Sequence, residues 1–343
     1  MNRSIPVLGA VVAGAVLAGW AGAALAQGSG SATLDAVRAR GQVICGVGGS
    51  IPGFSLPDSQ GVMRGLDADS CRVVAAAALG DASKVKFVPL TTQNRFTALQ
   101  SGEIDLLIRT TTWTLGREAN LGGMFTGINF YDGTGFLVKK ASGVKSVSAM
   151  DGATICVQPG TSTELAIQDW FRVHNMKFTP VLIDSLTEVE STFLSGRCDA
   201  MSSDSSQLAT FRGSQPNRDD LLVLPELISK EPLAAMVRKG DDKWFDLVRW
   251  GQFAQLNAEE EGITSKNVDD MMKSTNPDIR RLLGLEGDMG KALGVDNKWA
   301  YNIIKQVGNF AEMWDRNMTP LGVQRGLNAL WNKGGLQYAP PIL

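Results

Sequence analysis

Histidine is almost absent from this chain of 343 residues, and neither sign of charge dominates. The one histidine, His174, is a poor basis for a metal site or a histidine-based catalytic triad, and we expect it to be a surface or helix-cap residue. Lysine and arginine together number 33 against 35 for aspartate and glutamate, so a basic surface for nucleic acid is not expected. We expect no metal and no cofactor.

Long apolar runs are confined to the N-terminus. Arg3 lies in a basic start, an apolar stretch follows, and Ala24, Leu25 and Ala26 form a small-residue cleavage site, which predicts a signal peptide over residues 1–26. The alternative is an uncleaved anchor, since the run from Ile5 to Ala26 could just span a bilayer. No cysteine lies near the cleavage site, so a lipid anchor is not indicated. The mature protein is expected to be exported and soluble.

Cysteine is also scarce, with four residues, all beyond the predicted cleavage site. An even number in an exported chain favours disulfides, although four cysteines allow three pairings. Four buried free thiols are the alternative. The pairing depends on the internal repeat of the chain.

The chain repeats a strand–helix–strand–helix–strand pattern, first over residues 42–108 and again over residues 153–203. The letters FVP at 87–89 correspond to FTP at 178–180, and SGEID at 101–105 corresponds to SGRCD at 195–199. Two such units predict an α/β protein of two lobes, each with a mainly parallel sheet flanked by helices. Right-handed crossovers place the first strand of each unit beside the third.

This arrangement makes the cysteine pairing predictable. Cys156 and Cys198 lie on the first and third strands of the second unit, which should be neighbours. Cys45 and Cys71 lie on the first strand and first helix of the first unit. We therefore predict one bridge within each lobe, Cys45–Cys71 and Cys156–Cys198, which leaves the lobes free to move.

The rest of the chain predicts two crossings between the lobes and a helical end. The segments FLVKKASG from Phe136 and MVRKGDD from Met236 are similar and extended, so we expect them to cross. Helices are expected from about Ile263, the last beginning at Thr319 with proline at its first position, and they should pack on the first lobe. The predicted division is residues 33–137 for the first part of lobe 1, 138–233 for lobe 2, and 234–343 for the return to lobe 1 and the C-terminal extension.

Hydrogen-bonding side chains follow the third strand of the first unit. In open α/β sheets the ligand site lies beyond the carboxyl ends of the strands, which here is the stretch from Arg109 to Thr112. The same offset in the second unit falls on Asp204. Donors from one lobe and a carboxylate from the other would suit a zwitterion.

A helix start in the second unit adds a third element. The stretch QPGTSTE follows the first strand, and the N–H groups at a helix start attract an anion. Taken alone, Thr161 and Glu164 are more simply a capping box for that helix. Consecutive threonines are ordinary in strands, and Arg117 alone is an ordinary solvated side chain. Only their coincidence at the strand ends of a duplicated fold indicates a site.

Several stretches of the sequence resemble periplasmic polar amino-acid-binding proteins of ABC transporters. They are GLDADSCRVVAAAALGD, RFTALQSGEIDLLIRTTTWTLGRE, FYDGTGFLVKK, VQPGTSTE and GRCDAMSSD. The length and the C-terminal RGLNALWNKGGLQYAPP resemble the larger subgroup that binds general L-amino acids or glutamate, glutamine, aspartate and asparagine. The resemblance covers nearly the whole mature chain. It implies a two-lobe periplasmic binding protein-like II fold that closes on one amino acid, with a helical C-terminal extension.

The resemblance also implies roles for individual residues. In the family, strand-end hydroxyls and a helix start hold the ligand's α-carboxylate, an arginine pairs with it, and an aspartate accepts from the α-ammonium. A planar guanidinium suits a two-oxygen anion. The residues at these positions are Thr110 and Thr112, Thr161 and Ser162, Arg117, and Asp204.

The sequence departs from binders of basic amino acids. Gly48 stands where they carry an aspartate, and Ile51 where they carry a stacking tyrosine, which disfavours lysine or arginine as ligand. Arg109 stands where many members have serine; it is either part of a structural ion pair or a partner for an acidic or amide side chain. Phe54 is expected to form part of an apolar wall. Weaker candidates for side-chain contacts are Thr92 and Gln158.

The resemblance implies a periplasmic solute-binding protein, not an enzyme, that captures a free L-amino acid, polar or acidic or amide, and delivers it to a membrane-embedded ABC permease. We expect a monomer. One alternative is an enzyme on the same scaffold, similar to cyclohexadienyl dehydratases, but Asp204 paired with an ammonium would stay ionised and be a poor general acid. A solute-sensing module is the other alternative, and no signalling segment follows the predicted C-terminal helices.

Overall fold

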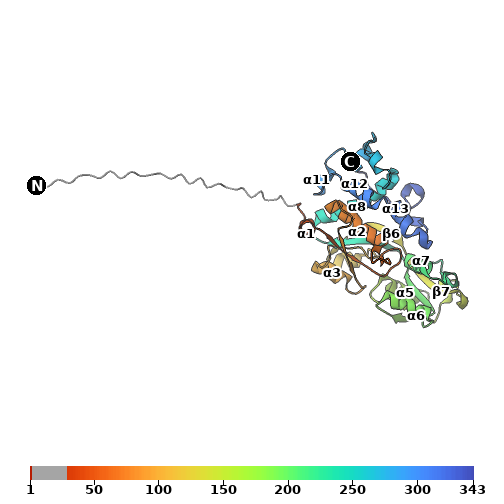
Figure 1. Ribbon diagram of the computed structural model, residues 1–343. Helices are drawn as coiled ribbons and strands as arrows, with labels where there is room; N and C mark the ends of the chain where they lie inside the picture. The colour runs from red at the N-terminus through yellow and green to blue at the C-terminus, as the bar shows by residue number, and fades with distance from the viewer. Residues whose placement is uncertain (2–28) are drawn as a thin grey trace.

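The structure is a computed structural model that describes Met1 and residues 29–343 (Figure 1). The predicted signal peptide and its cleavage site at Ala26 lie outside the described residues, apart from Met1. Within the part that is described, no helix combines the length and the apolar character needed to cross a membrane.

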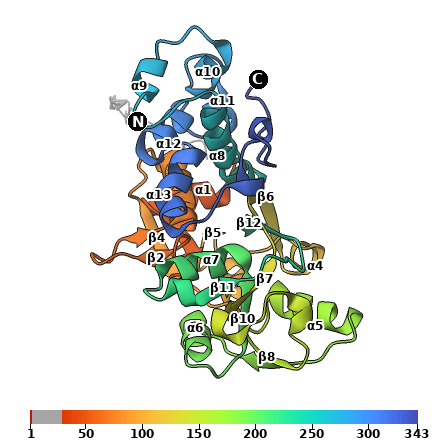
Figure 2. The same cartoon turned by 90° about the vertical axis from the view of Figure 1, so that its right-hand side faces the viewer.

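Two five-stranded sheets, one in each of two lobes, form the framework (Figures 1 and 2). In each sheet three neighbouring strands are parallel, the fourth pairs antiparallel with them, and the edge strand pairs antiparallel with the fourth. The lobe 1 sheet has the order β4 (Val85–Pro89), β1 (Val43–Val47), β5 (Leu106–Leu107), β12 (Glu231–Arg238), β6 (Gly123–Asp132). The lobe 2 sheet has the order β11 (Leu221–Val223), β7 (Thr134–Lys139), β10 (Ala200–Asp204), β8 (Ala153–Val157), β9 (Phe178–Leu182). A small hairpin, β2 (Leu56–Pro57) and β3 (Met63–Arg64), precedes the first long helix.

Helices pack on the two sheets and end where the sequence signals predict. The longest helix of the first repeat unit ends at Gly80, which takes a left-handed conformation and donates its N–H to the Ala76 carbonyl. Lobe 1 carries α1 (Ala32–Arg40), α2 (Leu66–Leu79), α3 (Arg95–Ser101), α4 (Leu115–Asn120) and α8 (Asp242–Glu260). Lobe 2 carries α5 (Ser162–Val173), α6 (Leu186–Leu194) and α7 (Ser205–Ser214).

The predicted repeat and disulfides are confirmed. β1 pairs in parallel with β5, and β8 pairs in parallel with β10, as right-handed crossovers require. Cys45 is bonded to Cys71, and Cys156 to Cys198. Each bridge lies within one lobe, so neither one restrains the lobes relative to each other.

The chain crosses between the lobes earlier than the sequence analysis predicts. The first crossing is at Gly133, between β6 and β7, and the second is the segment 224–230, between β11 and β12. The segments beginning at Phe136 and Met236 instead form the ends of β7 and β12 and the turns that follow, and their strand residues pair with neighbouring strands. The expectation that they cross is wrong, because an extended pattern does not distinguish a strand inside a sheet from a connection. The chain enters the lobe 2 sheet at residue 134 and returns to the lobe 1 sheet at residue 231, whereas the predicted boundaries are 138 and 234.

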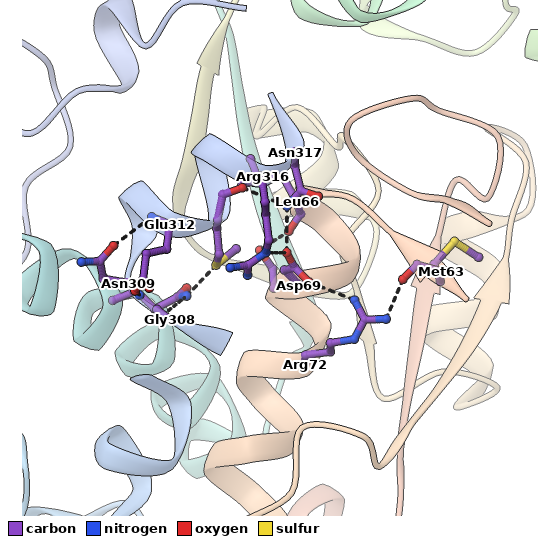
Figure 3. A network of polar contacts seen from close by, with 12 residues as sticks. Met63, Leu66, Asp69, Arg72, Gly308, Asn309, Glu312, Arg316 and Asn317 are labelled. Carbon is purple, nitrogen blue, oxygen red and sulfur yellow. Dashed lines mark hydrogen bonds and ion pairs between the residues drawn. The ribbon is translucent and has the colours of Figure 1, made fainter. Parts of the chain in front are cut away.

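The C-terminal extension packs on lobe 1, as predicted. Its helices α12 (Trp299–Val307) and α13 (Phe310–Asn317) contact α2 and α8. Figure 3 shows the polar anchor of this contact, the buried Asp69 of α2. Its carboxylate accepts from Arg72 at 2.9 Å, and from Arg316 and Asn317 at 2.7 Å each. The lobe 1 core therefore continues into the extension.

The helix predicted from Thr319 onward is wrong. This segment forms three short 3₁₀ turns, η4 (Thr319–Leu321), η5 (Gly326–Asn328) and η6 (Trp331–Lys333). Gly322, Gly326 and Gly334 have φ of 78°, 47° and 83°, which a right-handed helix cannot accommodate. The other helices of the extension are α9 (Val268–Met271), α10 (Pro277–Leu282) and α11 (Met289–Ala292), which lie at the end of the molecule opposite α5 and α6 (Figure 2).

One turn of the extension also touches lobe 2. η4 packs against α7, where a methyl group added at Gly213 would collide with the Leu321 carbonyl. A backbone atom cannot swing aside as a flexible side chain can. The extension therefore contacts both lobes, and glycine at position 213 permits the close approach.

We expect Gly213→Ala to lower the free energy of unfolding by about 1–3 kcal/mol, as overpacking does. Alanine alone would favour the helix by about 1 kcal/mol over glycine, so the collision decides the sign. Gly116→Ala in α4 is the matched control, because nothing lies within 4 Å of the added methyl. Urea unfolding followed by circular dichroism measures both. A Gly213→Ala variant as stable as the control would contradict the contact.

Candidate functional site

The residues after β5 form the lobe 1 wall of the candidate site. Arg109 to Thr112 are all buried, with Thr112 bridged to Leu233 of β12. Thr110 has a φ of 38°, which is rare for a β-branched residue, and its N–H donates to the Asp67 carboxylate at 3.1 Å. The backbone thus leaves the strand direction at Thr110, and Arg109, Thr110 and Thr112 line the surface that faces lobe 2.

Lobe 2 contributes the start of α5 and the end of β10. The Thr161 hydroxyl accepts from the Glu164 N–H at 3.1 Å and donates to the Gln158 carbonyl at 2.8 Å, so it serves the helix cap. Asp204, the last residue of β10, is 5% exposed and accepts from the Gln207 amide at 2.7 Å. The capping interpretation of Thr161 therefore holds for its hydroxyl group.

A small cavity between the lobes is lined by residues from both walls. The cavity also includes Thr92 and Gln158. Across the gap, the Thr112 hydroxyl lies 3.1 Å from the Ser162 hydroxyl, and the Thr92 hydroxyl lies 3.3 Å from the Pro159 carbonyl. The lobes are therefore in contact around the cavity, which is a closed arrangement. The predicted ligand residues that line it are Arg109, Thr110, Thr112, Arg117, Thr161, Ser162 and Asp204.

Phe54, which the sequence analysis expects in an apolar wall, does not line the cavity. Its ring is 1% exposed and packs on Phe130 with ring centroids 5.4 Å apart. Ile51 faces the cavity instead, because a bridge between Ile51 and Ser55 folds the loop back. The Ile51 side chain also occupies the space that a side chain at Gly48 would need. The wall is apolar where binders of basic amino acids carry an acidic group.

Arg95, which the sequence analysis passes over, lines the same cavity. It is the first residue of α3, it is 3% exposed, and its Nε has no hydrogen-bond partner among the described residues. Burial, together with the guanidinium groups of Arg109 and Arg117, lowers its pKa. One sequence signal could have revealed it. The dipole at a helix start disfavours a cation, so an arginine at that position indicates a role other than stabilising the helix.

The three arginines differ in how firmly they are held. The Arg109 Nε donates to the Leu90 carbonyl at 2.7 Å, and burial lowers its pKa to about 10. Arg117 donates from Nη1 to the Thr112 carbonyl at 2.8 Å and lies over the Phe96 ring. With Arg95, the cavity lining carries three guanidinium groups and only one carboxylate, that of Asp204. This excess of positive charge favours a ligand with more than one anionic group.

Burial raises the pKa of Asp204 well above its ordinary value, and the carboxylates of Asp132 and Glu231 raise it further. Arg117 and Arg95 act in the opposite direction. Burial also raises the pKa of Asp132, to about 6. These surroundings therefore shift Asp204 toward its protonated form, and a cationic group placed against it would shift it back toward the ionised form. In the described residues no group of three or more potential ligand side chains is placed to hold a metal ion.

Known proteins with similar sequences cover nearly the whole chain. The family described as bacterial extracellular solute-binding proteins, family 3, matches residues 43–276. The general L-amino acid-binding periplasmic protein AapJ of Rhizobium johnstonii is 50% identical over 341 residues, which is 98% of each chain. The glutamate/glutamine/aspartate/asparagine-binding protein BztA of Rhodobacter capsulatus is 52% identical over 325 residues, covering 93% of this chain and 96% of BztA.

One solved structure resembles this chain in architecture as well as in sequence. It is a periplasmic binding protein of an ABC transporter from Brucella ovis with glutathione bound. It shares 51% sequence identity and a TM-score of 0.89, and the match covers 91% of this chain and 99% of that one.

We expect binding of an L-amino acid to release a proton and to tighten as the pH rises. The raised pKa shifts Asp204 toward its protonated form in the empty cavity, and an ammonium against it favours the ionised form, so binding releases protons. Affinity then increases with pH through this pKa and levels off above it. Calorimetry with L-glutamate in two buffers of different ionisation enthalpy measures the protons released.

Asp204→Asn is the control for this titration, because an amide has no proton to release at these pH values. We expect it to bind weakly and without proton release. Proton uptake by the wild-type protein, or affinity that falls as the pH rises, would contradict the role assigned to Asp204.

Proposed function

The chain belongs to the bacterial extracellular solute-binding proteins, family 3, and we propose that it captures a free L-amino acid between its lobes in the periplasm and delivers it to an ABC permease. AapJ and BztA, which match it over nearly their full lengths, are named for the binding of amino acids. The described residues supply the two lobes, the crossings between them and a polar cavity at their interface.

The charge arrangement of this cavity carries the proposal. Arg117 comes from α4 of lobe 1, while Asp204 comes from the end of β10 in lobe 2, and both line the same cavity. An α-carboxylate against Arg117 and an α-ammonium against Asp204 would place opposite ends of one ligand on different lobes. Such a ligand binds the closed arrangement better than an open one, and it therefore stabilises closure.

The remaining arginines favour an acidic or amide side chain. Arg109 is partly committed to the Leu90 carbonyl and to the nearby Asp67, whereas Arg95 has an unpartnered Nε. A second carboxylate would therefore be received mainly by Arg95. Glutathione, bound in the Brucella ovis protein, also combines an amino-acid group with a further carboxylate. We accordingly propose glutamate and aspartate as preferred ligands, with their amides next.

We further propose that the protein is a monomeric binding protein without catalytic activity, released after cleavage at Ala26. The alternative enzyme would use Asp204 as a general acid, and burial raises the pKa of Asp204 in the direction that this role requires. The relatives named for binding favour transport instead. A calorimetric panel of the common amino acids and glutathione separates these functions. Tight binding of several polar amino acids supports the proposal. The absence of binding across the panel, together with turnover of prephenate or arogenate, would overturn it.

Substitution of two arginines should have different effects on this panel. We expect Arg117→Ala to abolish binding of every amino acid, because all of them present the same α-carboxylate. Arg95→Gln should lower the affinity for glutamate and aspartate by about tenfold or more, as expected for loss of one charged hydrogen bond. The affinity for their amides should fall less.

Arg172→Ala is the matched control, because Arg172 is exposed and its one ion pair within residues 29–343 is with Asp169 on the same helix. We expect it to bind like the wild type. Normal binding by Arg117→Ala, or a uniform loss across all ligands in Arg95→Gln, would show that the two subsites are assigned incorrectly.

A further inference from the structure

We propose that Glu231 is a positioning residue that stabilises the closed, ligand-holding arrangement through Ser162; this inference rests on the proposed function. Glu231 is the first residue of β12, directly after the second crossing between the lobes, and it lies opposite Asp132 at the first crossing. It is 2% exposed. A buried carboxylate at a hinge has to be satisfied by hydrogen bonds in whichever arrangement buries it.

The partners of Glu231 come mainly from lobe 2. Its Oε2 accepts from the Ser162 hydroxyl at 2.8 Å, at the first turn of α5. Its Oε1 accepts from the Thr134 hydroxyl at 3.2 Å, at the start of β7, and from the Ser229 hydroxyl at 2.6 Å, in the crossing segment itself. Thr134 and Ser229 lie at the crossings, where movement of the lobes is smallest. Ser162 lies beside the cavity, so its bond to Glu231 is the one that depends on closure.

This bond extends into the cavity. A serine hydroxyl has a single proton, and Ser162 donates it to the Glu231 carboxylate, so in the Ser162–Thr112 contact of 3.1 Å Thr112 is the donor. The Thr112 carbonyl in turn accepts from Arg117 at 2.8 Å. The chain Arg117, Thr112, Ser162, Glu231 thus crosses from lobe 1 to Ser162 of lobe 2 and returns to lobe 1 at the first residue of β12.

Two consequences follow from this order of donors. The hydroxyl protons of Thr112 and Ser162 are directed along the chain, so they are not directed at a ligand in the closed arrangement. Opening of the lobes would separate Ser162 from Thr112 and Glu231. The Glu231 carboxylate would then be hydrated in place of its bond to Ser162. Glu231 therefore favours closure by a charge-assisted hydrogen bond, and it acts on ligand release without touching the ligand.

Stopped-flow kinetics with L-glutamate test this role. We expect Glu231→Gln and Ser162→Ala each to increase the dissociation rate, Ser162→Ala by about tenfold, with little change in the association rate. The double variant should dissociate no faster than Ser162→Ala alone, because both substitutions remove the same interaction. Additive effects in the double variant, or an unchanged dissociation rate in Ser162→Ala, would overturn the proposal.

Glu259→Gln is the matched control for the loss of a buried carboxylate. Glu259 is 8% exposed and pairs with Arg325 in the C-terminal extension, outside the cavity lining. We expect it to lower the melting temperature and leave the dissociation rate unchanged. If Glu231→Gln fails to fold, an unchanged dissociation rate in Ser162→Ala still overturns the proposal. Failure of the wild-type protein to bind any amino acid would instead overturn the proposed function.

Discussion

Charge buried between two movable lobes is the constraint on which the rest of the structure depends. Three guanidinium groups and the carboxylate of Asp204 line one small cavity, and such groups are costly to bury unless each finds a partner. The fold satisfies some of them internally, as with Arg109 and the Leu90 carbonyl, but leaves Arg95 incompletely bonded and raises the pKa of Asp204. The proposed ligand, a zwitterion with a second carboxylate, would complement the charges that remain.

Much of this framework is readable from the sequence because it repeats. The duplicated strand–helix pattern predicts two lobes, adjacent first and third strands, and disulfides confined to each lobe, all of which the structure confirms. The same duplication relates Thr110 to Asp204, and both line the cavity. Periodicity and register are local properties of the sequence, which explains why these features could be predicted.

Other features depend on contacts that no local pattern records. Arg95 lines the cavity beside Thr92, which contacts Pro159 of lobe 2. Phe54 lies outside it and packs on Phe130, which is itself stacked on Trp314 of the C-terminal extension. The hydrogen bonds of Glu231 to Ser162 and Thr134 join residues that are 69 and 97 positions apart in the sequence. The segment after Thr319 is different, because the information was present in the sequence. Its glycines argue against the helix predicted there.

A crystal structure of the protein with L-glutamate tests the central claim most directly. The account predicts the ligand between the lobes, its ammonium against Asp204, its α-carboxylate against Arg117, and its second carboxylate facing Arg95. A glutamate held in the reverse orientation, or one bound outside the cavity lined by these residues, would contradict it.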